Sequence, residues 1–537
     1  IQENLDNFIK LLKDQKIKDD KHKLAAVIKL ISIITNYHYR TTDFFDKIFS
    51  VIIFLKDDIQ KYYSNCEIFH FFSNKKVLLF LFREKIIDLN NSIVSNLIID
   101  YGLSDTGMYL YPEIKQHINE TCAEYLEIPE NLEELREIEY EDNHIIPLIQ
   151  KDLIDEFITY ISTKQFDLNE EIENSSIFET NPLIMQLEIQ TAIEYATFFG
   201  SIKIFKYLLA QKCNLTSNLL LFAIHGRNPE IIHILEENEI ETKEIYEKCF
   251  SLAIKCHHNE LADYILNNYL NNEDTSTTIF KKSLKNFNYS LIQPEKVNSD
   301  SFNEICNRDH YILAKYLLDK DKSIDINSSI KRKRKEKWTE VQIQTEYTAL
   351  FTAISLGNTD IAELLLENKD VDVNKKSFEN CDNDNDKHKD MTPLFIAALQ
   401  RDSKIVSLLL EHKDIDVNMK SKNGKEEEAP INAAIESNDD EIVQMLLSHK
   451  DIDVNIISMK YDEDIDECTS EFYREVTPLY QAAGFCDNPK IVQLLLNHKN
   501  IDINAIIKIR EEQYYTFTRK KFDPRNIEET ALYAAID

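Results

Sequence analysis

Apolar residues recur at helical spacing in several stretches of the chain that share one layout. The four clearest stretches are residues 348–374, 392–418, 429–455 and 477–504. Each holds a short apolar helix and then a second one in which an isoleucine precedes a pair of apolar residues, as in Ile405, Leu408 and Leu409. Each stretch therefore predicts a hairpin of two helices that buries its apolar face only by stacking on a neighbouring hairpin.

The ends of each predicted hairpin carry start and stop signals. Thr392-Pro393-Leu394 offers a hydroxyl that caps a helix and a proline at a position that a helix start tolerates. The tail Asp414–Asn418 ends the second helix and turns the chain outward. A further copy begins at Thr530 and is truncated by the end of the sequence.

The layout resembles the ankyrin repeat, a β-turn plus two helices, in its Thr-Pro-Leu opening, its alanines, its Ile-Val-x-Leu-Leu-Leu run and its Asp-Val-Asn tail. The glycine that the family places after the first helix is present as Gly357, whereas other copies read Arg401-Asp402 and Asn438-Asp439 there. The histidine that the family places after Thr-Pro-Leu is absent. The resemblance implies an all-α fold, with stacked helical hairpins in a solenoid and long loops between repeats.

Fainter copies extend the pattern upstream. Residues 191–215 keep the alanine, glycine and paired-leucine positions, and residues 145–169 end in Phe-Asp-Leu-Asn. We expect degenerate ankyrin repeats over 145–270, an irregular insert over 271–301 and clearer repeats over 302–537, the last one truncated.

Residues 1–140 carry apolar periodicity without the repeat, which predicts a helical N-terminal domain. Segments 36–48, 67–82 and 109–114 resemble a helical domain that precedes ankyrin repeats in expanded families of trichomonad protists. That resemblance implies a protist origin and brings no assigned activity. The scarcity of glycine and proline, 7 and 11 residues, also favours helices over turn-rich β architecture.

The net charge limits the class of partner that we expect, and the cysteine content indicates the cellular compartment. A net charge of −32 argues against duplex nucleic acid as the main partner. The nine cysteines are scattered without a CxxC pair, as is typical of a reducing compartment, and the longest apolar stretch is too short to insert in a membrane. We therefore expect a cytoplasmic protein, with association with the cytoskeleton as the finer expectation.

The connections between the clearer repeats are long and differ in chemistry. Residues 331–335 read KRKRK, whereas 461–467 read YDEDIDE. Long, varied tips on a regular scaffold are a common source of binding specificity, although drift in a tolerant loop is an equal alternative and nuclear import a weaker one for the basic run. The predicted partner-binding residues are Lys331, Arg332, Trp338, Tyr514, Tyr515, Phe517 and Phe522.

No pattern assigns a catalytic, cofactor-binding or metal-binding residue. Residues 382–390 have the alternating carboxylates of a calcium loop but lack its glycine and its final glutamate, so a solvated loop is the better interpretation. His412, His449 and His498 recur with the repeat, and we expect each to act as a cation at a helix end rather than as a metal ligand.

The sequence thus predicts a non-enzymatic scaffold or adaptor that binds protein partners. The more specific prediction is a structural component of a large multi-protein assembly, such as a cytoskeletal one. The alternative is a substrate-recruiting part or subunit of an enzyme whose catalytic domain lies outside this chain. The identity of the partner separates the two.

Overall fold

The fold is known from a computed structural model. It describes residues 2–37, 43–99, 102–118, 132–133, 136, 145–172, 177–238, 243–270, 275–321, 323–335, 342–381, 384–465, 468–515 and 525–534. The chain divides into two compact units, Ile1–Gln293 and Pro294–Asp537. Among the helices that the structure describes, none combines the length and the apolar character that a bilayer span requires.

The first unit opens with helices packed around an apolar core that includes Leu24, Ile52, Leu55 and Val77, all fully buried. Between the sixth and seventh of these helices the chain forms a two-stranded antiparallel ribbon of β1 (Ile98–Ile99) and β2 (Gly102–Leu103). The helices are α1 (Gln2–Asp14), α2 (Lys21–Tyr37), α3 (Phe44–Tyr62), α4 (Asn65–Phe71), α5 (Lys75–Arg83), α6 (Asn91–Leu97), α7 (Asp105–Tyr109) and α8 (Tyr111–Ile114).

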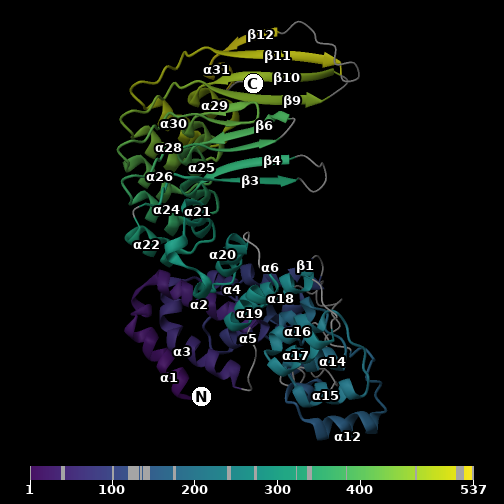
Figure 1. Cartoon of the computed structure of the whole chain (residues 1–537). Helices are drawn as coiled ribbons and strands as arrows, with labels where there is room; N and C mark the ends of the chain where they lie inside the picture. The colour runs from purple at the N-terminus through teal and green to yellow at the C-terminus, as the bar shows by residue number, and fades with distance from the viewer. Residues whose placement is uncertain are drawn as a thin grey trace. The chain divides into compact units, whose positions relative to one another are not determined.

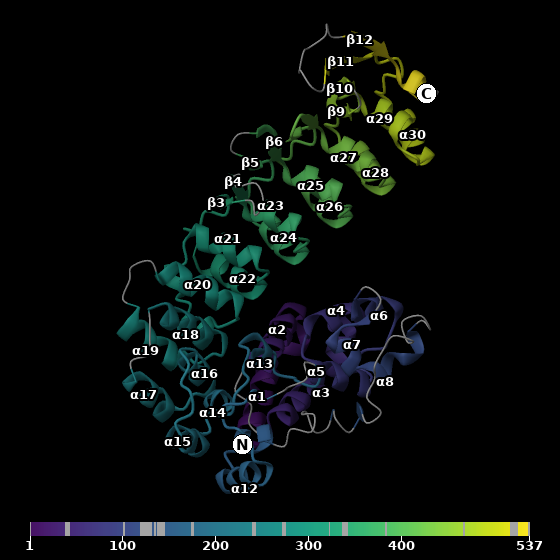
Figure 2. The same cartoon turned by 90° about the vertical axis from the view of Figure 1, so that its right-hand side faces the viewer.

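Helical hairpins fill the rest of the first unit, and their first helices α14, α16 and α18 stack in sequence (Figure 2). A Cβ on Gly226 would collide with the carbonyl oxygen of Thr197, so glycine lets α14 and α16 approach closely. The helices are α11 (Ile145–Gln150), α12 (Ile154–Lys164), α13 (Pro182–Gln186), α14 (Ala192–Phe199), α15 (Ile202–Ala210), α16 (Leu219–Gly226), α17 (Pro229–Glu237), α18 (Lys243–Lys255), α19 (Asn259–Tyr269) and α20 (Thr275–Lys285).

The second unit repeats the helical hairpin with the spacing that the apolar pattern predicts. The side-chain oxygens of Thr348, Thr392 and Thr477 accept the predicted capping bonds, each from the backbone N–H three residues later. First helices stack on first helices and second on second. The hairpins are α21 (Ser299–Asn307) with α22 (Tyr311–Lys320), α23 (Ala349–Ser355) with α24 (Thr359–Leu366), α25 (Pro393–Leu399) with α26 (Ser403–Glu411), α27 (Pro430–Glu436) with α28 (Asp440–Leu447) and α29 (Pro478–Phe485) with α30 (Pro489–Leu496), followed by α31 (Ala531–Ala534).

The chain is mostly helical, but the expectation of an all-α fold is wrong for the long connections of the second unit. Each connection forms a β-hairpin instead of a loop (Figure 1). The paired strands are β3 (Ser329–Lys335) with β4 (Gln342–Thr348), β5 (Ser377–Cys381) with β6 (Asp384–Met391), β7 (Ser421–Asn423) with β8 (Glu426–Glu428), β9 (Ser458–Ile465) with β10 (Cys468–Val476) and β11 (Ile507–Tyr515) with β12 (Arg525–Glu529).

Neighbouring β-hairpins also pair with each other, so the ten strands form one antiparallel sheet in sequence order, which we call the hairpin sheet. Figure 1 shows these strands stacked in a row on one side of the first helices, with the second helices on the other side. The lateral ladders differ in length. Seven residue pairs join β10 to β11, whereas two join β6 to β7 and one joins β8 to β9.

Candidate functional site

The hairpin sheet is the most distinctive surface of the second unit, and the repeat itself positions it. The second strand of each β-hairpin ends at the cap of the next first helix, as β6 does at Met391 before Thr392. A strand therefore leads directly into a helix, and the stacking of the helices brings successive β-hairpins side by side. Strands that are distant in sequence then satisfy each other's backbone hydrogen bonds.

Buried serines lock the sheet to the helices at the base of three β-hairpins. The Oγ of Ser377 accepts the backbone N–H of Thr348 at 3.1 Å, and Ser421 does the same for Thr392 at 2.9 Å. Ser458 accepts the N–H of Ala429 at 3.1 Å. Each bond joins one repeat to the next, because donor and acceptor lie 29 residues apart.

The asparagine that ends each repeat joins neighbouring tails in a second ladder. The side chain of Asn418 donates to the carbonyl of Asp451 at 2.7 Å and accepts the N–H of Asp453 at 2.9 Å. Asn327, Asn374 and Asn455 make the equivalent pair of bonds. The recurring Asp-x-Asn tail is thus a connection between repeats as well as a turn.

The predicted basic residues Lys331 and Arg332 lie on β3, the first strand of the hairpin sheet. The Lys331 side chain is 78% exposed, and its Nζ lies 3.4 Å from the Glu346 carboxylate across the ladder. The Arg332 side chain is half exposed and donates to the Glu304 carboxylate at 2.6 Å. Glu304 is buried and also pairs with Arg308, so Arg332 has a structural partner while Lys331 faces solvent.

The predicted aromatic cluster is described only in part. Tyr514 and Tyr515 lie on β11 and are in register with Thr469 and Cys468 of β10. The structure thus extends the sheet into the segment that the sequence suggested as a docking loop. The other predicted aromatic residues, Trp338, Phe517 and Phe522, lie outside the described residues.

A partly buried ionic cluster in the middle of the sheet gave no signal in the sequence. The Nζ of Lys460 on β9 lies 2.7 Å from Glu428 on β8, and it also bonds to Glu436 at the end of α27. Burial raises the pKa of the Glu428 carboxyl to about 7, although Lys460 acts in the opposite direction. These residues lie 32 and 24 positions apart in the sequence, and only the lateral pairing of β8 with β9 brings them together.

Charge is unevenly distributed along the hairpin sheet. Its first strand carries the basic run, whereas β8 and β9 are rich in carboxylates. Glu463, Glu471 and Glu512 occupy facing register positions on β9, β10 and β11.

The other residues weighed from the sequence have structural roles. Each recurring histidine makes a local turn contact, because Nδ1 of His412, His449 and His498 lies 3.3 Å from the backbone N–H of the residue two positions later. Much of the rejected calcium loop, from Asp384 on, is strand β6. Within the described ranges, no three His, Cys, Asp or Glu side chains gather in a way that could hold a metal ion.

Comparisons with known proteins agree with the repeat. Models of ankyrin repeats match residues 345–375, 376–458 (the model of three copies) and 475–508. A domain of unknown function, DUF3447, matches residues 210–293 in the first unit. No curated protein matches the sequence.

Two solved structures resemble the chain weakly. One is EF0377, an ankyrin repeat protein, with 19% identity and a TM-score of 0.29 over 45% of this chain and 92% of that one. The other is the ankyrin repeat domain of Bcl-3, a unique member of the IkappaB protein family, with 14% identity and a TM-score of 0.31 over 46% of this chain and 97% of that one.

The family models cover most of the helical hairpins whose threonine caps and asparagine tails are described above. Ankyrin repeats are protein-interaction modules, so the second unit is built to bind protein partners. The chain is an ankyrin-repeat protein in which another domain precedes the repeats.

Proposed function

We propose that the chain is a non-enzymatic scaffold or adaptor whose protein partner docks on the hairpin sheet. The observation that supports this most directly is the lateral pairing of β-hairpins from successive repeats into one sheet. A sheet fixed by backbone bonds loses little conformational freedom when a partner binds, so less binding energy is spent on ordering it. Separate loops of the same length would have to be ordered one by one.

The charge distribution suggests what the partner surface looks like. A partner segment over β3 would be acidic, to match Lys331, and one over β8 and β9 would be basic. The predicted aromatic residues Trp338, Tyr514 and Phe517 would add buried contact area to the docked partner. A protein partner with one acidic and one basic segment fits this surface better than nucleic acid does.

The finer proposal is a cytoplasmic structural component of a large multi-protein assembly, such as a cytoskeletal one. Repeats that stack through two hydrogen-bond ladders provide the stiffness that such a component needs. In the alternative, the chain recruits substrates for an enzyme whose catalytic part is another protein or domain. The structural component and the recruiting subunit would use the same surface, and they differ in which proteins co-purify with the chain.

The experiment is capture of partners on the full chain, with cross-linking and identification of the bound proteins. The triple variant Tyr514→Ser, Tyr515→Ser, Phe517→Ser and the double variant Lys331→Glu, Lys333→Glu should each lose the partner about tenfold or more. Tyr316→Ser is the matched control, because Tyr316 is 47% exposed on α22, away from the sheet.

If the triple variant, the double variant and the Tyr316→Ser control all bind the partner equally well, with unchanged melting temperatures, the binding surface lies elsewhere. A captured enzyme whose turnover depends on this chain would favour the recruiting subunit over the scaffold. A cytoskeletal polymer, or a large complex of fixed composition, would favour the structural component.

A further inference from the structure

The second helices of the second unit lie side by side on the face opposite the hairpin sheet (Figure 1). Ion pairs close the furrows between some of them. Lys404 on α26 pairs with Glu363 on α24, and Lys490 on α30 pairs with Asp440 on α28. In both furrows the lysine occupies the same helical position in its repeat.

The furrow between α26 and α28 is different. Both helices are fully described, and no hydrogen bond or ion pair joins their side chains. The position of Lys404 and Lys490 is taken by Glu441 in α28, and the position of Glu363 is taken by Ser407 in α26. Because neither member of the ion pair is present here, this furrow stays open between two furrows that are bridged.

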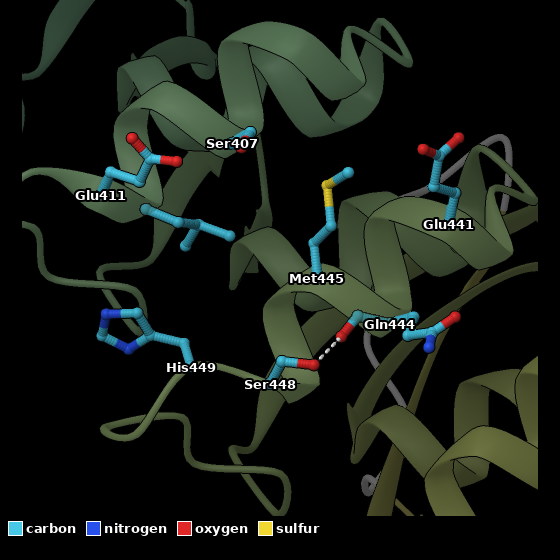
Figure 3. Close-up of a pocket in the computed structure, with 8 residues that line it drawn as sticks. Ser407, Glu411, Glu441, Gln444, Met445, Ser448 and His449 are labelled. Carbon is cyan, nitrogen blue, oxygen red and sulfur yellow. Dashed lines mark hydrogen bonds between the residues drawn. The ribbon is translucent and has the colours of Figure 1, made fainter.

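The open furrow is a groove with an apolar floor and charged ends. Leu410 and Met445 are half-buried in it, and Glu411 and Glu441 are exposed. Figure 3 shows Glu411 and Glu441 at opposite ends with Met445 between them. His449 closes the side near Glu411, and its Nδ1 lies 3.3 Å from the backbone N–H of Asp451.

The two carboxylates are about 10 Å apart along the helices, because they are seven positions apart in the aligned repeats and a helix rises about 1.5 Å per residue. A helix that lies along the groove would meet both with basic residues at positions i and i+7. An apolar residue at i+3 or i+4 on the same face would then reach the floor between them. The charge and the spacing together define one kind of ligand.

We propose that the groove between α26 and α28 binds a basic amphipathic helix of a protein partner, with two cationic side chains seven residues apart and an apolar one midway. This site is independent of the hairpin sheet, which lies on the other side of the first helices. The proposal therefore does not rest on the function proposed above. It gives the second unit two docking faces.

The test uses the full chain and a fluorescein-labelled, alanine-based helical peptide with two lysines seven residues apart and two leucines midway, read by fluorescence anisotropy. Binding should saturate and weaken as salt is added. The variant Glu411→Lys, Glu441→Lys should bind at least about tenfold more weakly, because both rim contacts become repulsive. Its fold should persist, since Lys at the start of α28 is unfavourable to the helix dipole and Lys at the end of α26 is favourable.

The matched control is Glu156→Lys, Glu170→Lys, which makes the same change in net charge at two exposed carboxylates of the first unit and should bind normally. A peptide with glutamates in place of the lysines should bind the Glu411→Lys, Glu441→Lys variant better than the native chain. Equal binding of both peptides to the native chain, no loss in the groove variant, or no saturable binding at millimolar peptide would overturn the proposal.

Discussion

At the scale of single residues, the turn between the two helices of a hairpin places one backbone position in the left-handed region. Gly357 has a φ of 71°, and the equivalent Arg401 and Asn438 have φ values of 60° and 58°. The left-handed region costs a side-chain-bearing residue about 1 kcal/mol, less for asparagine than for most others. The departures from the family's glycine that the sequence shows are thus tolerated at the expense of local strain.

Arg401→Gly should therefore raise the free energy of unfolding of the second unit by up to about 1 kcal/mol. Gly357→Ala is the reciprocal change and should lower it by about 1 kcal/mol. A Cβ at Gly357 would meet no atom within 4 Å, so its loss measures backbone strain alone. Urea unfolding followed by circular dichroism measures both. A destabilising Arg401→Gly would mean that the arginine side chain makes a contact worth more than the strain.

The buried carboxyl of Glu428 makes stability depend on pH. Its pKa rises from an ordinary value of 4.5 to about 7 in the folded protein, so it takes up a proton on folding. The resulting stabilisation is present below about pH 4.5 and is lost as the pH rises through about 7. Glu428→Gln removes the titrating group. Between pH 5 and pH 8, the free energy of unfolding of this variant should therefore rise by up to about 2 kcal/mol relative to that of the native chain.

Thermal melting of the two proteins across that pH range checks this prediction. Glu427→Gln, one residue away and exposed on β8, is the control and should follow the native chain. Parallel curves for Glu428→Gln and the native chain would show that Lys460 keeps the carboxyl ionised throughout.

At the scale of elements, the helices could be predicted from the sequence and the strands could not. Apolar spacing, threonine caps and proline positions lie within one repeat, so they identify α25 or α29 locally. The strands contain residues such as Asp462, Glu463 and Asp464 of β9, which disfavour strands on their own. Their pairing becomes favourable only when stacking brings the next β-hairpin alongside.

Some local signal for the strands was present. Ile343 and Thr345 on β4, and Ile507 and Ile509 on β11, alternate with polar residues and are buried. The serines that accept the inter-repeat bonds also recur three positions after the asparagines Asn374, Asn418 and Asn455, at Ser377, Ser421 and Ser458. Among the candidate site residues, the exposed basic run of β3 could be found from the sequence alone. The ionic cluster around Lys460 could not, because its members come together only through the lateral pairing of β8 with β9.

The asparagine ladder predicts a difference between two chemically identical changes. Asn418→Ala removes two bonds to the following repeat and should cost about 1–2 kcal/mol. Asn504→Ala should cost less, because the Asn504 side chain bonds to none of the described residues. Hydrogen exchange of the 448–456 tail reports the loss directly, and equal costs at both positions would show that the asparagine acts within its own turn.

The stacked leucines predict a larger effect. Leu409 and Leu495 are fully buried between helices, so replacement of either by Ala should cost about 2–5 kcal/mol. Leu496→Ala is the control, since its side chain is 44% exposed and should cost little. The damage should reach mainly the flanking repeats, because a solenoid is stabilised by contacts between neighbours. Exchange protection lost evenly through the chain after Leu409→Ala would contradict that.

At the scale of the whole molecule, the second unit combines two kinds of cooperativity. The helices couple each repeat to its neighbours through apolar packing, and the hairpin sheet couples the same repeats through backbone bonds. A partner on the sheet and a helix in the α26–α28 groove would both bind a unit that is already ordered. Their affinities should therefore be nearly independent of each other, with a coupling factor close to one.

The short β-hairpin of β7 and β8 also determines how the second unit behaves under mechanical load. Two residue pairs tie it to β6 and one ties it to β9, whereas four join β4 to β5 and seven join β10 to β11. Tension along the stack of strands is shared between these ladders and the helix packing beside them, and within the sheet the ladder with the fewest bonds is the weakest. In a single-molecule pulling experiment on the second unit, rupture should begin at β8–β9, and the sheet should part into one block of strands before that seam and one after it.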